Sequence, residues 1–291
     1  MRILIGFNGT EASLTAIQDL NRAGLPEKAE AIVVSVAETW DQPVNEEEAR
    51  KAAGKAAEML RNNFSGWQIS TQTATGSPAS EILALSDRIE PDLIVVGEPT
   101  TKIGERGTFL GQTSHKLLTD AGCSVRVSRA RPAKSNEKLR LSVGFDGSPT
   151  SITAIDTILS RRWPDKTEVR LVAVADSNVL QMIGRFTPQM MDSVVEERLV
   201  QQWAHSLAAP WLQKLDAAGL NSSVRVRFGN PKLVLTDDAH AWNTDAIFVG
   251  PHSSPNSFAR FLIGSVSATV AARADCSVEI VRGKHRELTL F

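Results

Sequence analysis

Two short stretches of this chain carry residue types that could hold a phosphorylated ligand. One is the turn at residues 146–148, Asp-Gly-Ser, which directly follows an apolar run. The other is residues 264–267, Gly-Ser-Val-Ser, where a helix is predicted to begin. A glycine lets a ligand approach the backbone, and the N–H groups of a helix start together with a serine hydroxyl suit a phosphate. Gly-Ser before a helix is also an ordinary cap, so the surrounding elements decide its meaning.

Those elements follow from an internal repeat. Residues 2–10 align with residues 140–148 at an offset of 138, and the offset persists through the next helix pattern and apolar run. Later landmarks match at an offset of 153, namely Gly76 with Gly229, Pro78 with Pro231, Gly97 with Gly250, Gly111 with Gly264 and Cys123 with Cys276. The offset grows by 15 residues, so the second copy carries an insertion of that length. A period near 150 residues indicates a duplicated domain rather than a solenoid.

Each copy predicts five strands that alternate with helices. Uninterrupted apolar runs, such as residues 93–96, are typical of strands buried on both faces of a parallel sheet. A helix opens at Ser148, a cap followed by proline at the first helical position. With right-handed crossovers, this order predicts an α/β protein of two repeated doubly wound domains. Each domain is expected to hold a five-stranded parallel sheet with helices on both faces.

We expect domain 1 over residues 1–130, a polar linker over 131–138, domain 2 over 139–283 and a C-terminal tail over 284–291. The insertion should lengthen the second helix of domain 2 to roughly residues 188–218. Its predicted apolar stripe is Val195, Leu199, Trp203 and Leu207, and Pro210 should kink or break it. Packing on its own domain or its twin is the leading interpretation, and a surface for a regulatory partner is the alternative.

Composition excludes several classes of function. The 291 residues carry a net charge of −1, unlike the clustered basic face of nucleic-acid-binding proteins. No apolar stretch reaches the 18 residues or so of a membrane span. The chain enters a predicted strand at Ile3 without a signal-peptide pattern, and its two cysteines suit a reducing compartment. We therefore expect a cytoplasmic protein that binds neither nucleic acid nor membrane.

The two copies differ where a ligand is expected. In an open parallel sheet, ligands bind at the carboxyl ends of the strands, where the turn after strand 1 meets the loop after strand 4. Domain 2 has Asp146 and Ser265 at these places, whereas domain 1 has Asn8 and Gln112. Asparagine lacks the anionic oxygen that holds a metal or a ribose hydroxyl strongly. If either pocket holds a nucleotide, the sequence favours domain 2.

Catalysis is less well supported. His252, Asp146 and Ser265 could converge in one crevice, but the chain has no nucleophile-elbow motif. The five histidines and two cysteines show no metal-ligand spacing. A small buried residue before strand 5 is the simplest reason for Cys123 and Cys276.

At these residues the chain resembles the universal stress protein family. Residues 145–148, Phe-Asp-Gly-Ser, look like that family's first-strand signature. Residues 247–250 with residues 262–267 and 276–278 look like its C-terminal signature, and domain 1 carries a looser version. The resemblance covers nearly the whole chain twice. It implies a tandem member with strand order 3-2-1-4-5 in each domain.

The resemblance also implies a ligand. Family members that bind ATP carry Gly-x-x-Gly, nine residues, then Gly-Ser or Gly-Thr after strand 4. Neither copy matches, because Thr100 and Ser253 replace the second glycine and both loops are one residue longer. Domain 2 keeps the final Gly-Ser and the strand-1 aspartate. The implied site holds ATP or another adenine nucleotide, with or without Mg²⁺, and Val174 lies near the base. Its residues are Gly144, Asp146, Val174, Gly250, Gly264, Ser265, Val266 and Ser267.

The leading interpretation is a non-catalytic stress-response or signalling module that responds to nucleotide. One alternative is a slow ATPase in which Asp146 helps to position a metal. Another is an interaction scaffold whose two pockets are both vestigial. Bound nucleotide excludes the scaffold, and formation of ADP separates the ATPase from the binder.

The two domains are also expected to pair with each other. In strand order 3-2-1-4-5, strand 5 is an edge whose unpaired backbone groups proteins normally cover. Apolar side chains recur there at period two, at Val125 and Val127 in one copy and Val278 and Ile280 in the other. Single-domain relatives form homodimers through this surface. We therefore expect an intrachain pseudo-dimer, with strand 3 and the insertion left for a homodimer of whole chains.

Overall fold

The computed structural model describes residues 1–38, 46–99, 110–129, 138–175, 193–251 and 263–283. The first half begins with β1 (Arg2–Gly6), α1 (Glu11–Asp19), a 3₁₀ turn η1 (Leu20–Arg22), β2 (Glu30–Ala37) and α2 (Glu46–Asn63). It continues with β3 (Gln68–Thr75), α3 (Pro78–Ile89), β4 (Leu93–Gly97), α4 (Gln112–Asp120) and β5 (Ser124–Ser128).

The second half repeats this order. It begins with β6 (Arg140–Gly144), α5 (Pro149–Leu159), β7 (Glu168–Ala175), α7 (Ser193–Ala217) and β8 (Asn221–Phe228). It ends with α8 (Pro231–Ala241), β9 (Ala246–Val249), α9 (Ser265–Arg273) and β10 (Ser277–Ile280). Among the described helices, none combines the length and the hydropathy that crossing a bilayer requires.

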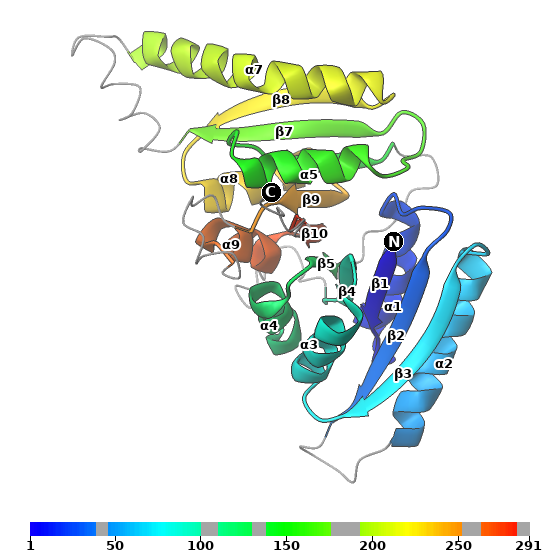
Figure 1. The fold of residues 1–291 in the computed structure, drawn as a ribbon. Helices are drawn as coiled ribbons and strands as arrows, with labels where there is room; N and C mark the ends of the chain where they lie inside the picture. Colours follow the sequence, from blue (N-terminus) through cyan, green and yellow to red (C-terminus); the bar gives the residue numbers. More distant parts are fainter. Residues whose placement is uncertain (39–45, 100–109, 130–137, 176–192, 252–262, 284–291) are drawn as a thin grey trace, which may run out of the picture.

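The strands form one ten-stranded sheet in the order β3-β2-β1-β4-β5-β10-β9-β6-β7-β8. All pairs within each half are parallel, so each half has the predicted order 3-2-1-4-5 and the predicted α/β fold is confirmed. The fifth strands, β5 and β10, pair antiparallel and join the halves. They lie at the centre of the molecule, and β3 and β8 lie at its two ends beside α2 and α7 (Figure 1). The pairing is the contact that the edge-strand argument predicts.

Local signals explain where the first helix of each half begins. Thr10 and Ser148 take extended backbone angles, and each hydroxyl accepts a hydrogen bond from the backbone N–H three residues later. Both residues are therefore helix caps, as predicted. Proline opens α3, α5 and α8, at positions whose N–H would be unpaired in any case.

The two faces of the sheet have different cores. On one face, α3, α4, α8 and α9 share a single hydrophobic core that is continuous across both halves, and it includes Val125, Val127, Val278 and Ile280. On the opposite face the core is split. One part lies under α1 and α2, and the other lies under α5 and α7. Side chains alternate along a strand, so the residue in the middle of each strand faces the split side. This residue is Arg126 in β5 and Glu279 in β10.

The inserted helix α7 corrects two expectations. It continues through Pro210, so of the predicted kink or break the break is wrong. Among its described side chains, Val200, Ala204, Ala208 and Leu215 are buried, and the first three each lie one position after a residue of the predicted stripe, of which Trp203 is 45% exposed. Apolar residues recur every four residues both in the predicted stripe and in the stripe one position later, so the spacing alone does not choose between them. The alanines of the observed stripe are small and let α7 approach the sheet closely. The side chain of Val195 lies outside the described part of the chain. Leu207, Trp211 and Leu212 pack against the core of the second half itself.

Candidate ligand-binding site

A cavity of about 530 Å³ opens at the carboxyl ends of β6, β7 and β9. All eight residues predicted for the site line it: Gly144, Asp146, Val174, Gly250, Gly264, Ser265, Val266 and Ser267. They come from three strand ends and the start of α9. The structure therefore brings the predicted set together in one place, and nucleotide binding there stays a prediction.

The cavity has both apolar and polar lining residues. The apolar ones include Val172 and Val174 of β7, Pro231 and Leu235 of α8, and Val249 of β9. The polar ones include Ser148, Ser265, Ser267 and Asp146. Such a mixture of apolar walls and a few polar groups is typical of small-molecule sites.

The turn after β6 is held in shape by its own contacts. The Asp146 carboxylate accepts a hydrogen bond from the Ser148 N–H at 2.9 Å. Gly147 has φ of +75°, and a Cβ there would lie 2.5 Å from Leu207 of α7. The backbone conformation therefore favours glycine at this position, and the Leu207 side chain of the inserted helix packs directly over it.

Helix α9 begins at the cavity. Gly264 is its N-cap, with φ of −68° and ψ of 153°, and no side-chain hydrogen bond caps this start within the described residues. Ser267 donates its hydroxyl to the Gly250 carbonyl at 2.5 Å. The N–H groups of a first helical turn lack partners within the helix and carry partial positive charge. This start of α9 is the feature of the cavity best suited to an anion.

Two of the predicted glycines have a packing reason. A Cβ on Gly250 would lie 2.5 Å from the Thr150 Cβ, and one on Gly144 would lie 2.9 Å from Val249. In the first half, a Cβ on Gly97 would lie 1.9 Å from the carbonyl oxygen of Ala12. Glycine at 97 and 250 therefore lets the first helix of each half pack closely, whereas glycine at 144 leaves room for the Val249 side chain of the neighbouring strand. Gly264 has no such conformational requirement, because any residue can adopt its extended backbone angles.

The equivalent place in the first half is nearly closed. The cavity there measures about 110 Å³, and Asn8, Glu38 and Ser114 are among its lining residues. Behind it, Glu98 is 9% exposed and accepts hydrogen bonds from the Gly111 N–H at 2.9 Å and the Ser114 hydroxyl at 2.6 Å. Gly111 is the N-cap of α4, as Gly264 is of α9. A carboxylate of the protein itself thus occupies the start of α4.

A sequence model of the universal stress protein family matches residues 1–129 and, separately, residues 139–282. The chain belongs to this family, as a tandem member. A putative universal stress protein of Staphylococcus aureus is 26% identical over 142 residues, which are 48% of this chain and 81% of that protein.

Solved universal stress proteins share the fold. One from Archaeoglobus fulgidus has a TM-score of 0.64 at 15% identity, and the match covers 98% of this chain and 97% of that one. An Arabidopsis thaliana family protein was solved with AMP bound, and it matches 47% of this chain and 97% of its own, with a TM-score of 0.31 and 18% identity.

Sequence reasoning about this universal stress protein missed Glu98. The signal was present, because the offset of 153 sets Glu98 opposite Pro251, each directly after a strand-end glycine. An acid at that point lies within reach of the helix start that the same loop precedes. The substituted loop positions Thr100 and Ser253, and the candidate His252, lie outside the described residues. Within the described residues, no group of three histidine, cysteine or acidic side chains could hold a metal ion.

Proposed function

We propose that this universal stress protein is a cytoplasmic, non-catalytic stress-response or signalling module whose second half binds an adenine nucleotide, ATP above all. The observation that carries the proposal is the contrast between two equivalent helix starts. Glu98 covers the start of α4, whereas the start of α9 opens into a cavity of about 530 Å³. Among the described residues, the second half offers an anion the larger space and a helix start that no carboxylate covers.

The cavity suits the uncharged parts of a nucleotide. Its volume lies within the roughly 300–1,000 Å³ typical of small-molecule sites, and the first half's cavity lies below that range. Val174 of β7 and Leu235 of α8 offer apolar surface to a planar base. Asp146 supplies carboxylate oxygens that can accept hydrogen bonds from ribose hydroxyls. These assignments support an adenine nucleoside as the core of the ligand.

The phosphates would lie at the start of α9. Backbone N–H groups of a helix start and the hydroxyl of Ser265 are donors for phosphate oxygens, whereas the Ser267 hydroxyl already donates to the Gly250 carbonyl. Mg²⁺ is usually held by one or two carboxylates together with the phosphates, and Asp146 is the one carboxylate among the described lining residues. A metal held in this way fits binding better than hydrolysis, since no second acid or histidine of the described lining could activate water.

The first half takes a structural role in this proposal. The Glu98 carboxylate neutralises the helix start that a phosphate would use, and Asn8 replaces the acid that would bind ribose. What the first half supplies is half of the central sheet and half of the shared core.

Small molecules released from freshly purified full-length protein test the proposal. Mass spectrometry should detect an adenine nucleotide, and calorimetry on the emptied protein should give one site per chain for ATP. No binding at millimolar ATP would favour the scaffold. Time-dependent ADP formation by the wild type, absent from an Asp146→Asn variant, would favour the slow ATPase.

A further inference from the structure

The contact between β5 and β10 has a pseudo-twofold centre at one pair of charged residues. Arg126 lies opposite Glu279, with Val125 opposite Ile280 and Val127 opposite Val278. Arg126 and Glu279 also occupy equivalent positions in the two copies, at the offset of 153. A residue at the centre of such a contact would meet its own copy in a homodimer. Here it meets a residue of opposite charge.

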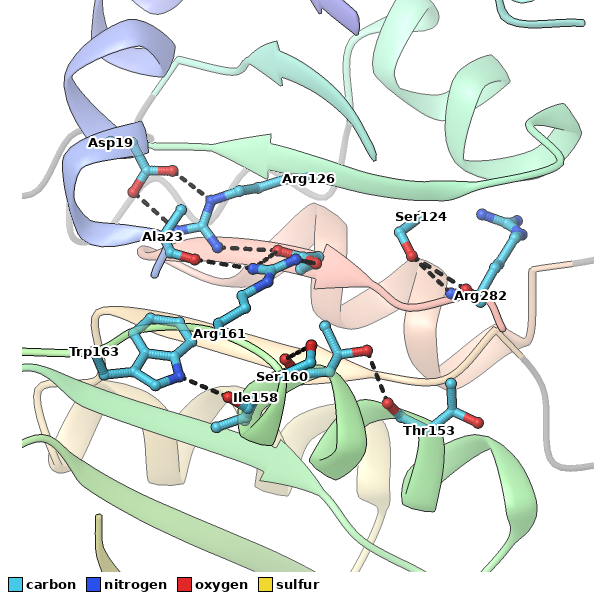
Figure 2. Close-up of polar contacts among 12 residues, drawn as sticks. Asp19, Ala23, Ser124, Arg126, Thr153, Ile158, Ser160, Arg161, Trp163 and Arg282 are labelled. Carbon is cyan, nitrogen blue, oxygen red and sulfur yellow. Dashed lines mark hydrogen bonds and ion pairs between the residues drawn. The ribbon is translucent and has the colours of Figure 1, made fainter. Parts of the chain in front are cut away.

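These charges belong to a buried network of four charged residues on the split face of the sheet, of which Figure 2 labels Asp19, Arg126 and Arg161. Arg126 is 1% exposed and Glu279 is fully buried. The Arg126 guanidinium donates to Asp19 at 2.7 and 3.1 Å and to Glu279 at 3.3 Å. Arg161 donates to Glu279 as well, at 2.9 Å through one of its two contacts. Burial acts to lower the pKa of Arg126, but Asp19 and Glu279 raise it above its ordinary value.

The loops beside this network are complementary in size. Arg161, Arg162 and Trp163 of the second half lie against Ala23 and Gly24 of the first half. Arg161 donates to the Ala23 carbonyl at 3.0 Å, and the Arg162 N–H donates to the Gly24 carbonyl at 3.0 Å. A Cβ on Gly24 would lie 2.8 Å from the Trp163 ring. At the offset of 138, Arg161 and Arg162 are the equivalents of Ala23 and Gly24.

Neither half fits its own copy in this register. Two first halves would bring Arg126 against Arg126 and leave space where Trp163 now packs. Two second halves would bring Glu279 against Glu279 and crowd the bulky loop against itself. A buried ion network contributes little net stability over apolar residues, but burial of like charges opposite each other is costly. The value of such a network lies in selecting the partner.

We propose that the fifth-strand edges of this protein form a matched pair, in which β5 accepts a fifth strand with a central acid and β10 accepts one with a central arginine. The partner of each edge is the opposite half of this chain, in the same molecule or in a second copy. Homotypic pairing through these edges is excluded by charge and by size. The duplication has thereby converted a surface that could pair with itself into one that requires two different halves.

The full-length protein with a protease recognition sequence between residues 130 and 137 tests this pairing. After complete cleavage, the two fragments should remain as 1:1 heterotypic complexes in native mass spectrometry. After mixing with isotope-labelled cleaved protein, labelled first halves should pair with unlabelled second halves, and the reverse. Homotypic pairs should remain at least about tenfold below the share that random pairing would give. Homotypic pairs at the statistical share, or fragments that separate at micromolar concentration, would overturn the proposal.

Charge variants in the same cleavable protein isolate the cause. Arg126→Glu sets an acid opposite Glu279 and should weaken the fragment complex at least about tenfold. Arg50→Glu makes the same charge change at an exposed residue of α2 and should leave the complex intact. If Arg126→Glu does not fold, the double variant Arg126→Gln, Glu279→Gln replaces both charges by amides that can pair with themselves. It should raise the homotypic share about tenfold, and an unchanged share would overturn the role of charge.

Discussion

Arg129 of the first half and Arg282 of the second half occupy equivalent positions, and each binds the last turn of the final helix in the other half. Arg129 donates to the Ala271 carbonyl of α9 at 2.6 Å. Arg282 donates to the Leu118 carbonyl of α4 at 2.5 Å and to the Cys123 carbonyl at 3.4 Å. The carboxyl end of a helix carries partial negative charge and unpaired carbonyls, so both arginines complement it. The exchange is reciprocal, as a pseudo-twofold relation requires.

Loss of these two arginines should have unequal effects. Burial lowers the pKa of both guanidinium groups and leaves Arg129 with two buried nitrogens, Nε and Nη1, that find no hydrogen-bond partner among the described residues. Arg282 has one such nitrogen and makes two carbonyl contacts. We therefore expect Arg282→Met to lower the free energy of unfolding by about 1–3 kcal/mol and Arg129→Met to lower it by less. Urea denaturation of both variants checks the order, and a larger loss for Arg129→Met would contradict it.

Nucleotide affinity should depend on Gly264. A β-branched residue there would stand at the start of α9 and keep phosphate oxygens from its N–H groups. Because Gly264 has φ of −68°, Gly264→Val should fold normally and lose at least about tenfold in ATP affinity, or 1.4 kcal/mol. Gly122→Val is the matched control, since a Cβ at Gly122 meets nothing within 4 Å. Calorimetry that gave equal ATP affinity for Gly264→Val and the wild type would show that the pocket is wrong.

Some of these features follow from the sequence and others do not. Apolar runs and caps such as Thr10 predict the elements, because strand burial and helix starts are local properties. The repeat and the family resemblance add the sheet order, and the edge argument adds the β5–β10 contact. The course of α7 through Pro210 and its shifted buried face depend on packing against the sheet, which a periodic pattern does not specify. Glu98 acts through a contact 13 residues away at Gly111, so its role required the folded loop.

Glu98 should be replaceable by an external anion. Glu98→Ala leaves the Gly111 N–H and the Ser114 hydroxyl without the carboxylate that binds them, at a cost of about 1–3 kcal/mol in unfolding free energy. Inorganic phosphate that binds the freed start of α4 should restore part of this loss, because a ligand of the native state stabilises it by mass action. Thermal unfolding with increasing phosphate measures the effect.

Glu38→Ala is the control for this experiment, since Glu38 lines the same small cavity and no hydrogen bond joins it to the start of α4 among those the structure describes. Its melting temperature should respond to phosphate as the wild type does. A Glu98→Ala variant that phosphate stabilises no more than Glu38→Ala would show that Glu98 does not cover an anion site. Adding Asn8→Asp and Gln112→Ser to Glu98→Ala extends the test to ATP, which the first half of this triple variant should bind weakly. If the first half of the wild type already binds ATP as tightly as the second, the proposed asymmetry is wrong.

The last prediction concerns pH and the start of β7. A hydrogen bond from Lys138 lowers the pKa of Glu168 below its usual value, and Arg140 adds to the effect at 3.0 Å. A carboxyl whose pKa is lower in the folded state stabilises the protein above its unfolded pKa, and the contribution disappears as pH falls through the folded pKa. Glu168→Gln should therefore lower the free energy of unfolding by about 0.5–1 kcal/mol at pH 7 and have no effect near pH 2. Glu30→Gln is the matched control, because Glu30 is the equivalent residue and its one ion pair with a described residue is the exposed pair with Arg2. Denaturation of both variants across this pH range decides the matter, and an equal loss at pH 7 and pH 2 for Glu168→Gln would assign it to packing rather than to charge.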